Sequence, residues 1–134
     1  MEYPHGYVVV DTASQLEPRP LFHWMTCCRF RPIIVKRLRD RDALVDVGIR
    51  IREQVASWES RPYDRKRSWS DDELYGAEMV WKLYDRALGI ELCPLADVAE
   101  NGKQDGGMTG APAGKSVTIA DIFRSPLLVE VHRE

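Results

Sequence analysis

The sequence predicts an α+β fold in which a small antiparallel sheet packs with helices. Two stretches, 42–58 and 70–88, carry apolar side chains at intervals of three and four residues, which is the spacing of amphipathic helices. Short runs rich in β-branched residues lie outside them and are bounded by turn residues, as strands are. With 134 residues, 44% of them apolar, the chain has the length and composition of one globular domain, 1–134.

The elements expected in the first part of the chain are short. Residues 7–10 form a valine-rich run that predicts a buried strand. Residues 15–20 contain two prolines and are expected to be irregular, whereas 20–24 are expected to open a short helical turn. Residues 33–38 predict a second strand, with Pro32 at its start, where proline is tolerated.

The first amphipathic stretch, 42–58, predicts a helix with one apolar face. Gly48 weakens this helix, and Pro62 breaks the pattern after it. The residues that share the apolar face are Leu44, Val47, Ile51, Val55 and Trp58.

The second stretch, 70–88, is the most strongly marked element of the chain. Ser70 is a suitable capping residue, Glu73 follows at the capping-box spacing, and Gly89 is the expected stop. The apolar face consists of Leu74, Ala77, Val80, Trp81, Tyr84, Ala87 and Leu88. Residues 90–92 look extended. A flexible, glycine-rich loop is expected over 97–116, and residues 117–131 are expected to close the domain.

Charge and cysteine content argue against several function classes. The net charge of −2 argues against a nucleic-acid-binding protein, and the basic residues between Arg29 and Arg41 are diluted by acidic ones. The cysteines, Cys27, Cys28 and Cys93, are odd in number and lack zinc-ligand spacing, so they predict neither a disulfide framework nor a metal site. No apolar run has the length of a membrane span, and no signal-peptide pattern opens the chain. We therefore expect a cytoplasmic protein without a cofactor.

Gly76 is the unusual residue of the second predicted helix. Glycine inside a helix costs about 1 kcal/mol relative to alanine, so its presence calls for a reason. One interpretation is a packing site, at which another backbone comes close to the helix. The other interpretation comes from the residues around it.

The run YGAEMVWKLY, from Tyr75 to Tyr84, and the run ALGIEL that follows resemble the YiiX/YebB-like hydrolases of bacteria. Residues 62–64 and 122–129 resemble further parts of the same family. The resemblance spans about 6–131 and implies a permuted papain-like core, related to the NlpC-type cell-wall peptidases. The family's nucleophile is a cysteine, and the matching position in this sequence is Gly76.

The chemistry of such a hydrolase depends on that cysteine. A thiolate attacks the substrate, a helix N-terminus favours the anionic sulfur, and a histidine moves the proton. Glycine has no atom with which to attack. The resemblance therefore implies an inactive member that binds a peptide, an acyl ligand or a protein partner. Two alternatives stay open: a working hydrolase that uses a water or a relocated thiol, Cys27 or Cys28 with His23 nearby in sequence, and a truncated or mutated form of an active enzyme.

Two alignments of the start of the chain are compatible with the family. In one, His5 to Val8 stands for the family's histidine strand. In the other, which the spacing favours, it stands for the next strand, so that the core is N-terminally shortened. The second alignment places Asp11 or Thr12 at the third, orienting polar position. It also predicts an exposed sheet edge, and with it a homo-oligomer or a partner strand.

The family resemblance also suggests residues for a substrate groove: Tyr63, Glu78 and Trp81. Two of them have a simpler interpretation, because a first-turn glutamate favours the helix dipole and a helical tryptophan is often part of the core. His5, His23 and His132 are candidate bases that are also explained as solvated side chains.

Overall fold

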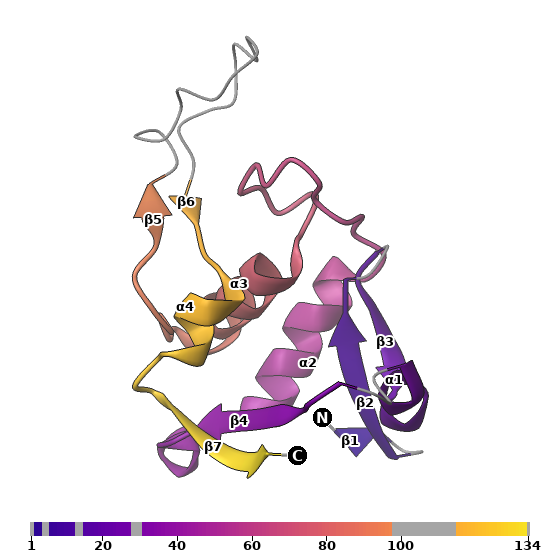
Figure 1. Cartoon of the computed structure of the whole chain (residues 1–134), viewed down its shortest axis with the longest axis vertical. Helices are drawn as coiled ribbons and strands as arrows, with labels where there is room; N and C mark the ends of the chain where they lie inside the picture. Colours follow the sequence, from indigo (N-terminus) through magenta and orange to yellow (C-terminus); the bar gives the residue numbers. More distant parts are fainter. Residues whose placement is uncertain (1, 4–5, 13–14, 28–30, 98–114, 134) are drawn as a thin grey trace, which may run out of the picture.

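The computed structural model describes residues 2–3, 6–12, 15–27, 31–97 and 115–133. Its helices are α1 (Leu21–Cys27), α2 (Val47–Trp58), α3 (Gly76–Leu88) and α4 (Ile119–Phe123), with a 3₁₀ turn at Arg41–Ala43. The strands are β1 (Glu2–Tyr3), β2 (Gly6–Asp11), β3 (Glu17–Pro20), β4 (Ile34–Leu38), β5 (Ala96–Asp97), β6 (Lys115–Ser116) and β7 (Leu128–Arg133). The α+β class predicted from the sequence is confirmed (Figure 1).

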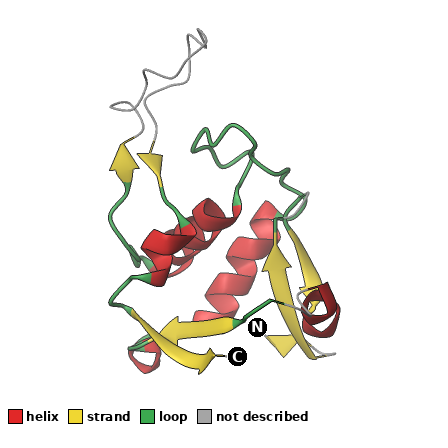
Figure 2. Cartoon of the chain, viewed as in Figure 1, coloured by secondary structure: helices red, strands yellow, loops and turns green. Residues whose placement is uncertain are grey.

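The strand pairs of the described chain are antiparallel, as expected, but they form three separate ladders and not one small sheet. The first has the order β1-β2-β3, and the other two pair β4 with β7 and β5 with β6. Figure 2 shows the β1-β2-β3 ladder beside α2 and the β4–β7 ladder below it. The β5–β6 ladder lies at the opposite end of the structure. The predicted strands 7–10 and 33–38 are confirmed as β2 and β4.

Residues 15–20 were expected to be irregular, and this expectation is wrong for 17–20. In the β2–β3 ladder, Val10 lies opposite Pro18 and Val8 lies opposite Pro20. Proline cannot donate a ladder hydrogen bond, but an edge strand needs to pair on one side only. β3 is such an edge, so alternate prolines fit it.

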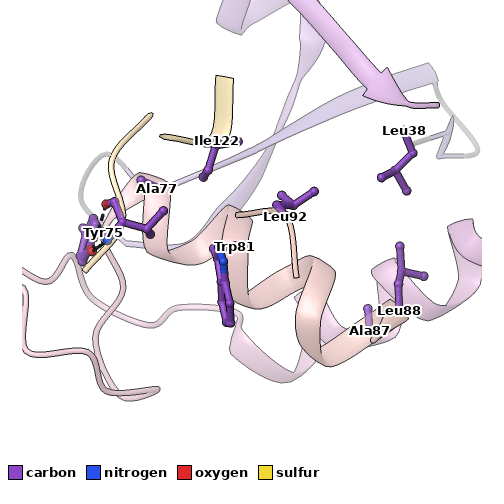
Figure 3. Close-up of a cluster of buried hydrophobic side chains, with 9 residues drawn as sticks. Leu38, Tyr75, Ala77, Trp81, Ala87, Leu88, Leu92 and Ile122 are labelled. Atoms are coloured by element: carbon purple, nitrogen blue, oxygen red, sulfur yellow. Dashed lines mark hydrogen bonds between the residues drawn. The ribbon is translucent and has the colours of Figure 1, made fainter. Parts of the chain in front are cut away.

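The helix α3 lies at the centre of the hydrophobic core. One side of it, with Met79 and Leu83, packs against α2 and the fully buried Leu16. The other side, with Trp81 and Leu88, belongs to a second cluster. Figure 3 shows this second cluster along α3, with Ile122 of α4 over the first turns and Leu38 of β4 over the end. The helix α3 is therefore buried on both sides.

Both long helices begin later than the sequence predicts. In α3, the Ser70 carbonyl accepts from Lys82 and the Leu74 N–H donates to Pro62, so these backbone groups serve tertiary contacts and not a helical turn. In α2, Asp46 takes a left-handed conformation (φ 53°) that separates the helix from the preceding 3₁₀ turn. The predicted stop of α3 is confirmed, because Gly89 is also left-handed (φ 68°).

Of the predicted loop 97–116, the structure describes only the two ends. Asp97 pairs with Lys115 in the β5–β6 ladder, and residues 98–114 lie outside the described residues. Residues 90–92 form no named strand. None of the helices in the described ranges combines the length and hydropathy that a membrane span requires.

Candidate functional site

Gly76 is the first residue of α3, not an interior one. The preceding Tyr75 is extended (φ −99°, ψ 161°), and the helical conformation starts after it. The interior penalty for glycine therefore does not apply at this position. A Cβ added to Gly76 would meet, among the described residues, only the Thr12 hydroxyl oxygen within 4 Å, at 3.9 Å. No backbone atom from elsewhere in the described chain comes within 4 Å of this position, so the described residues give no support to a backbone packing site at Gly76.

A pocket of about 220 Å³ opens beside this helix start. Its walls come from three segments: the loop before α3, the first turn of α3, and the chain that leads into α4. The lining residues are Tyr63, Arg67, Tyr75, Gly76, Ala77, Val117, Thr118 and Ile119. The pocket thus combines a helix N-terminus, one guanidinium and several apolar groups.

Tyr75 joins two of these walls. Its buried hydroxyl donates to the Val117 carbonyl and accepts from the Val117 N–H, both at 3.2 Å. Burial raises the pKa of this hydroxyl, so it stays protonated and keeps the donor role. The start of α3 and the segment before α4 are therefore tied together directly under the pocket.

The loop before α3 holds Arg67 in a strained backbone conformation. Arg67 and Trp69 both have φ of 53°, in the left-handed region that side chains other than glycine seldom adopt. The fully buried Asp64 supports this shape, because its carboxylate accepts from the N–H groups of Lys66 (3.0 Å) and Ser68 (2.7 Å). In this conformation the Arg67 guanidinium lies 5.3 Å from the centre of the Tyr75 ring.

A buried ion network fastens the same loop to α3. Lys82 is 1% exposed, and its ammonium lies 2.7 Å from both Glu78 Oε1 and Asp71 Oδ1 and 2.9 Å from the Ser70 carbonyl. The ammonium also lies 4.7 Å from the Trp69 ring. Glu78 is fully buried, and its Oε1 has no partner with hydrogen-bond geometry in the described chain, so its contact with Lys82 is an ion pair only.

The two carboxyl groups of this network shift in opposite directions. Burial raises the pKa of Glu78, and the nearby Lys82 offsets this only in part. Burial alone would also raise the pKa of Asp71, but the hydrogen bond and charge of Lys82, with Arg86, outweigh it and hold that pKa below its usual value. Of the two carboxyl groups that contact Lys82, Asp71 is therefore stabilised in its charged form, whereas the charged form of Glu78 is disfavoured by burial.

The structure brings together some of the predicted site residues and separates others. Thr12 is 3% exposed and faces Gly76, while the Asp11 carboxylate accepts from the Thr12 N–H at 2.7 Å. Tyr63 lines the pocket, as suggested for the groove. Neither Glu78 nor Trp81 lines it. Glu78 pairs with Lys82, and the buried Trp81 donates its indole N–H to the Cys93 carbonyl at 2.8 Å.

The alternative nucleophile and the candidate bases lie elsewhere. Cys27 is the last residue of α1 and is exposed, and His23, on the same helix, packs against Phe22. His132 belongs to β7. None of these residues lines the pocket at Gly76. His5 and Cys28 lie outside the described residues.

Comparison with known proteins finds a relative in sequence and a similar solved structure. No family model matches it. An 84-residue segment is 29% identical to an uncharacterized protein of Escherichia coli K12, YiiX, and the match covers 63% of this chain but only 41% of YiiX. The chain is similar to YiiX. The predicted resemblance to YiiX is thereby confirmed, although the match spans less than half the length of this relative.

The fold agrees with this assignment. The crystal structure of metalloprotein YiiX from Escherichia coli O157:H7 matches with a TM-score of 0.78 over 95% of this chain and 76% of that one. Identity in the match is 24%, so the comparison shows a shared fold and no more than that.

Sequence reasoning missed several residues of the pocket. Thr118 was detectable, because Asp121 follows it at the capping-box spacing, and the structure confirms that Thr118 caps α4. Arg67 gave no signal. Its place in the pocket depends on a left-handed backbone conformation. A basic residue in a polar loop does not predict that conformation.

Proposed function

We propose that this protein is a binding module built on a permuted papain-like hydrolase scaffold, and that it holds a ligand without cleaving it. The observation that carries the proposal is the position of Gly76. It stands at the N-terminus of a buried helix and beside a pocket, where a thiol hydrolase of this type would place its cysteine.

The composition of the pocket supports binding over catalysis. Nucleophilic hydrolysis of this kind needs a thiolate and a base that moves the proton. None of the described residues that line the pocket is a cysteine or a histidine. What the pocket offers is shape, apolar surface and hydrogen-bond donors. These are the properties of a site for a peptide, an acyl ligand or a segment of a protein partner.

A metal site is not part of this proposal, although YiiX is described as a metalloprotein. Across the described ranges, no three side chains of histidine, cysteine, aspartate or glutamate gather closely enough to hold a metal ion. The donor set that divalent transition metals require is thus not assembled there. We assign no step to a metal.

Hydrolysis through a relocated thiol is the competing function. It would require Cys27 or Cys28 to replace the missing sulfur at a site other than the Gly76 pocket. Cys27 is exposed at the C-terminal end of α1, so no helix N-terminus of α1 activates it, and it is not among the described residues that line the Gly76 pocket. The geometry therefore favours binding.

An assay of ester, thioester and amide substrates separates these functions. The wild-type protein and a variant with Cys27→Ala, Cys28→Ala and Cys93→Ala are incubated with the same panel, and products are followed by mass spectrometry. We expect no turnover above the uncatalysed rate from either protein. Turnover that the substitutions abolish would establish the relocated-thiol enzyme. Turnover that survives them would also contradict the proposal, since the pocket would then cleave without a thiol.

A further inference from the structure

The loop before α3 is closed at its base by its own backbone. The Leu74 N–H donates to the Pro62 carbonyl at 3.0 Å, and the Asp64 N–H donates to the Leu74 carbonyl at 3.2 Å. Tyr63 and Leu74 also form an isolated β-bridge. Residues 64–73 therefore leave and re-enter the fold at one place, which is the arrangement of an Ω-loop. Because Leu74 is fully buried, this base is anchored independently of the rest of the loop.

Lys82 of α3 attaches the 64–73 loop to the helix. Its ammonium contacts the Asp71 carboxylate and the Ser70 carbonyl of the loop and lies 4.7 Å from the centre of the Trp69 ring. Trp69 in turn meets Trp81 of α3 edge-on, with ring centres 5.6 Å apart. These loop residues help to bury the Lys82 side chain, which is 1% exposed.

Two features of the closed loop oppose its closure. Arg67 and Trp69 have φ of 53°, a conformation that is strained for residues other than glycine. Closure also keeps the Lys82–Glu78 pair away from water, and Glu78 Oε1 has no hydrogen-bond partner in the described chain beyond this ionic contact. Desolvation offsets much of the attraction within a buried ion pair. We therefore expect the loop to open at a lower free-energy cost than global unfolding.

The same loop forms one wall of the pocket at Gly76. Arg67 lines this pocket, and its guanidinium lies 5.3 Å from the centre of the Tyr75 ring. The pocket has a volume of about 220 Å³, below the roughly 300–1,000 Å³ that is typical of small-molecule sites. Movement of the 64–73 loop away from α3 would remove the Arg67 wall and widen the pocket.

We propose that the 64–73 loop is a flap that opens as a unit about its base at Tyr63 and Leu74, and that Lys82 is the side chain that holds it closed. Opening breaks the contacts of Lys82 with Ser70 and Asp71 and exposes the ammonium to solvent. It also widens the pocket for a peptide or acyl ligand, a consequence that rests on the proposed binding function. The opening itself needs no ligand and is tested without one.

Acetylation of Lys82 by N-hydroxysuccinimidyl acetate measures the opening, because the closed loop keeps this amine from the reagent. The exposed Lys66 gives the rate of an unprotected lysine in the same molecule. Peptide mass spectrometry yields the initial rate at each lysine. Amide hydrogen exchange of the ¹⁵N-labelled protein reports global unfolding through the α3 amides and the state of the base through the Asp64 and Leu74 amides. We expect Lys82 to react more slowly than Lys66 but faster than global unfolding allows, while the base amides stay protected.

Asp71→Ala removes one of the contacts that hold the loop closed. The Asp71 side chain is 47% exposed, so the core stays intact in this variant. We expect acetylation of Lys82 to become about fivefold faster, as for the loss of a partly exposed ion pair. Asp72→Ala is the matched control on the same loop. Asp72 is 89% exposed and lies 3.7 Å from Arg61, so its removal leaves the Lys82 contacts in place and the rate unchanged.

Acetylation of Lys82 only at the rate of global unfolding would overturn the inference, and so would acetylation as fast as that of Lys66. Exchange of the Asp64 and Leu74 amides through the same opening would show that the loop does not move about an intact base. Equal Lys82 rates in Asp71→Ala and Asp72→Ala would show that Lys82 does not hold the loop closed. The proposed function fails on a different observation, namely product formation in the hydrolysis assay.

Discussion

The hydroxyl oxygen of Thr12 lies 3.9 Å from the position that a Cβ at Gly76 would occupy. A Cβ at Gly76 would therefore be in ordinary van der Waals contact with Thr12, the residue that follows β2. On the proposed scaffold the attacking sulfur would extend from this Cβ. Glycine has no side chain there.

A cysteine at position 76 should be tolerated by the fold but should not by itself give hydrolysis. Gly76→Cys places a thiol at a helix N-terminus, where the dipole favours the thiolate and lowers the thiol pKa below its ordinary value of about 8.5. We expect iodoacetamide to alkylate this thiol faster at neutral pH than it alkylates Cys27, which serves as a control in the same molecule. Alkylation rates against pH, measured by mass spectrometry, check this. A titration of the new thiol at or above the ordinary pKa would contradict it, and the variant should not hydrolyse the substrate panel.

Removing the buried ammonium should be severely destabilising. Lys82→Met leaves Glu78 buried without its ion pair, and loss of one partner from a buried pair costs about 3–5 kcal/mol of unfolding free energy. Urea unfolding followed by circular dichroism measures the loss. Arg86→Met is the matched control, because Arg86 also pairs with Asp71 but is exposed, and it should cost less than about 1 kcal/mol. Similar losses of unfolding free energy in both variants would show that the buried Lys82–Glu78 pair stabilises the fold no more than an exposed ion pair does.

The fold could be predicted from the sequence to the extent that apolar spacing encodes it. β2, β4 and the buried faces of α2 and α3 follow from that spacing, and Gly89 marks the end of α3 correctly. The start of α3 could not be predicted this way. Ser70 to Glu73 has the pattern of a cap, but Lys82 recruits the Ser70 carbonyl from a position twelve residues away. A tertiary contact thus overrides the local signal.

Only some residues of the candidate site could be predicted from the sequence. The position of Gly76 came from the family resemblance, and the structure brings Thr12 and Tyr63 to it. Arg67 and Ile119 reach the pocket from segments that have no shared pattern, and only folding brings them together. Glu78 and Trp81 were suggested for the groove because of their neighbours in sequence, yet helical geometry directs them to the ion network and the core.

The raised pKa of Glu78 predicts how stability depends on pH. The folded protein takes up this proton more readily than the unfolded chain, so the stability that the group contributes is full below the ordinary glutamate pKa of 4.5 and is lost as pH rises through the folded pKa. We therefore expect the unfolding free energy of wild type, relative to Glu78→Gln, to fall as pH increases above 4.5. Urea unfolding of both proteins across this range provides the measurement. A difference that grows with pH would mean that the Lys82 charge outweighs burial.

The Tyr75 hydroxyl should contribute to stability through its two hydrogen bonds to Val117. Tyr75→Phe removes both hydrogen bonds to Val117 and leaves two buried backbone groups without their partner, at a cost of about 1–3 kcal/mol. Thermal unfolding compares it with Tyr63→Phe, a control on the exposed side of the same pocket that should stay within about 0.5 kcal/mol of wild type. Equal stability of the two variants would argue that Tyr75 does not join the two walls.

One NMR experiment tests the central claim most directly. The ¹⁵N-labelled wild-type protein is mixed with N-acetylated peptides that carry a free carboxylate, and the amide signals of Gly76 and Ala77 are recorded together with the peptide signals over hours. The account predicts that the protein signals shift while the peptides stay whole. Cleavage of the peptides would contradict it.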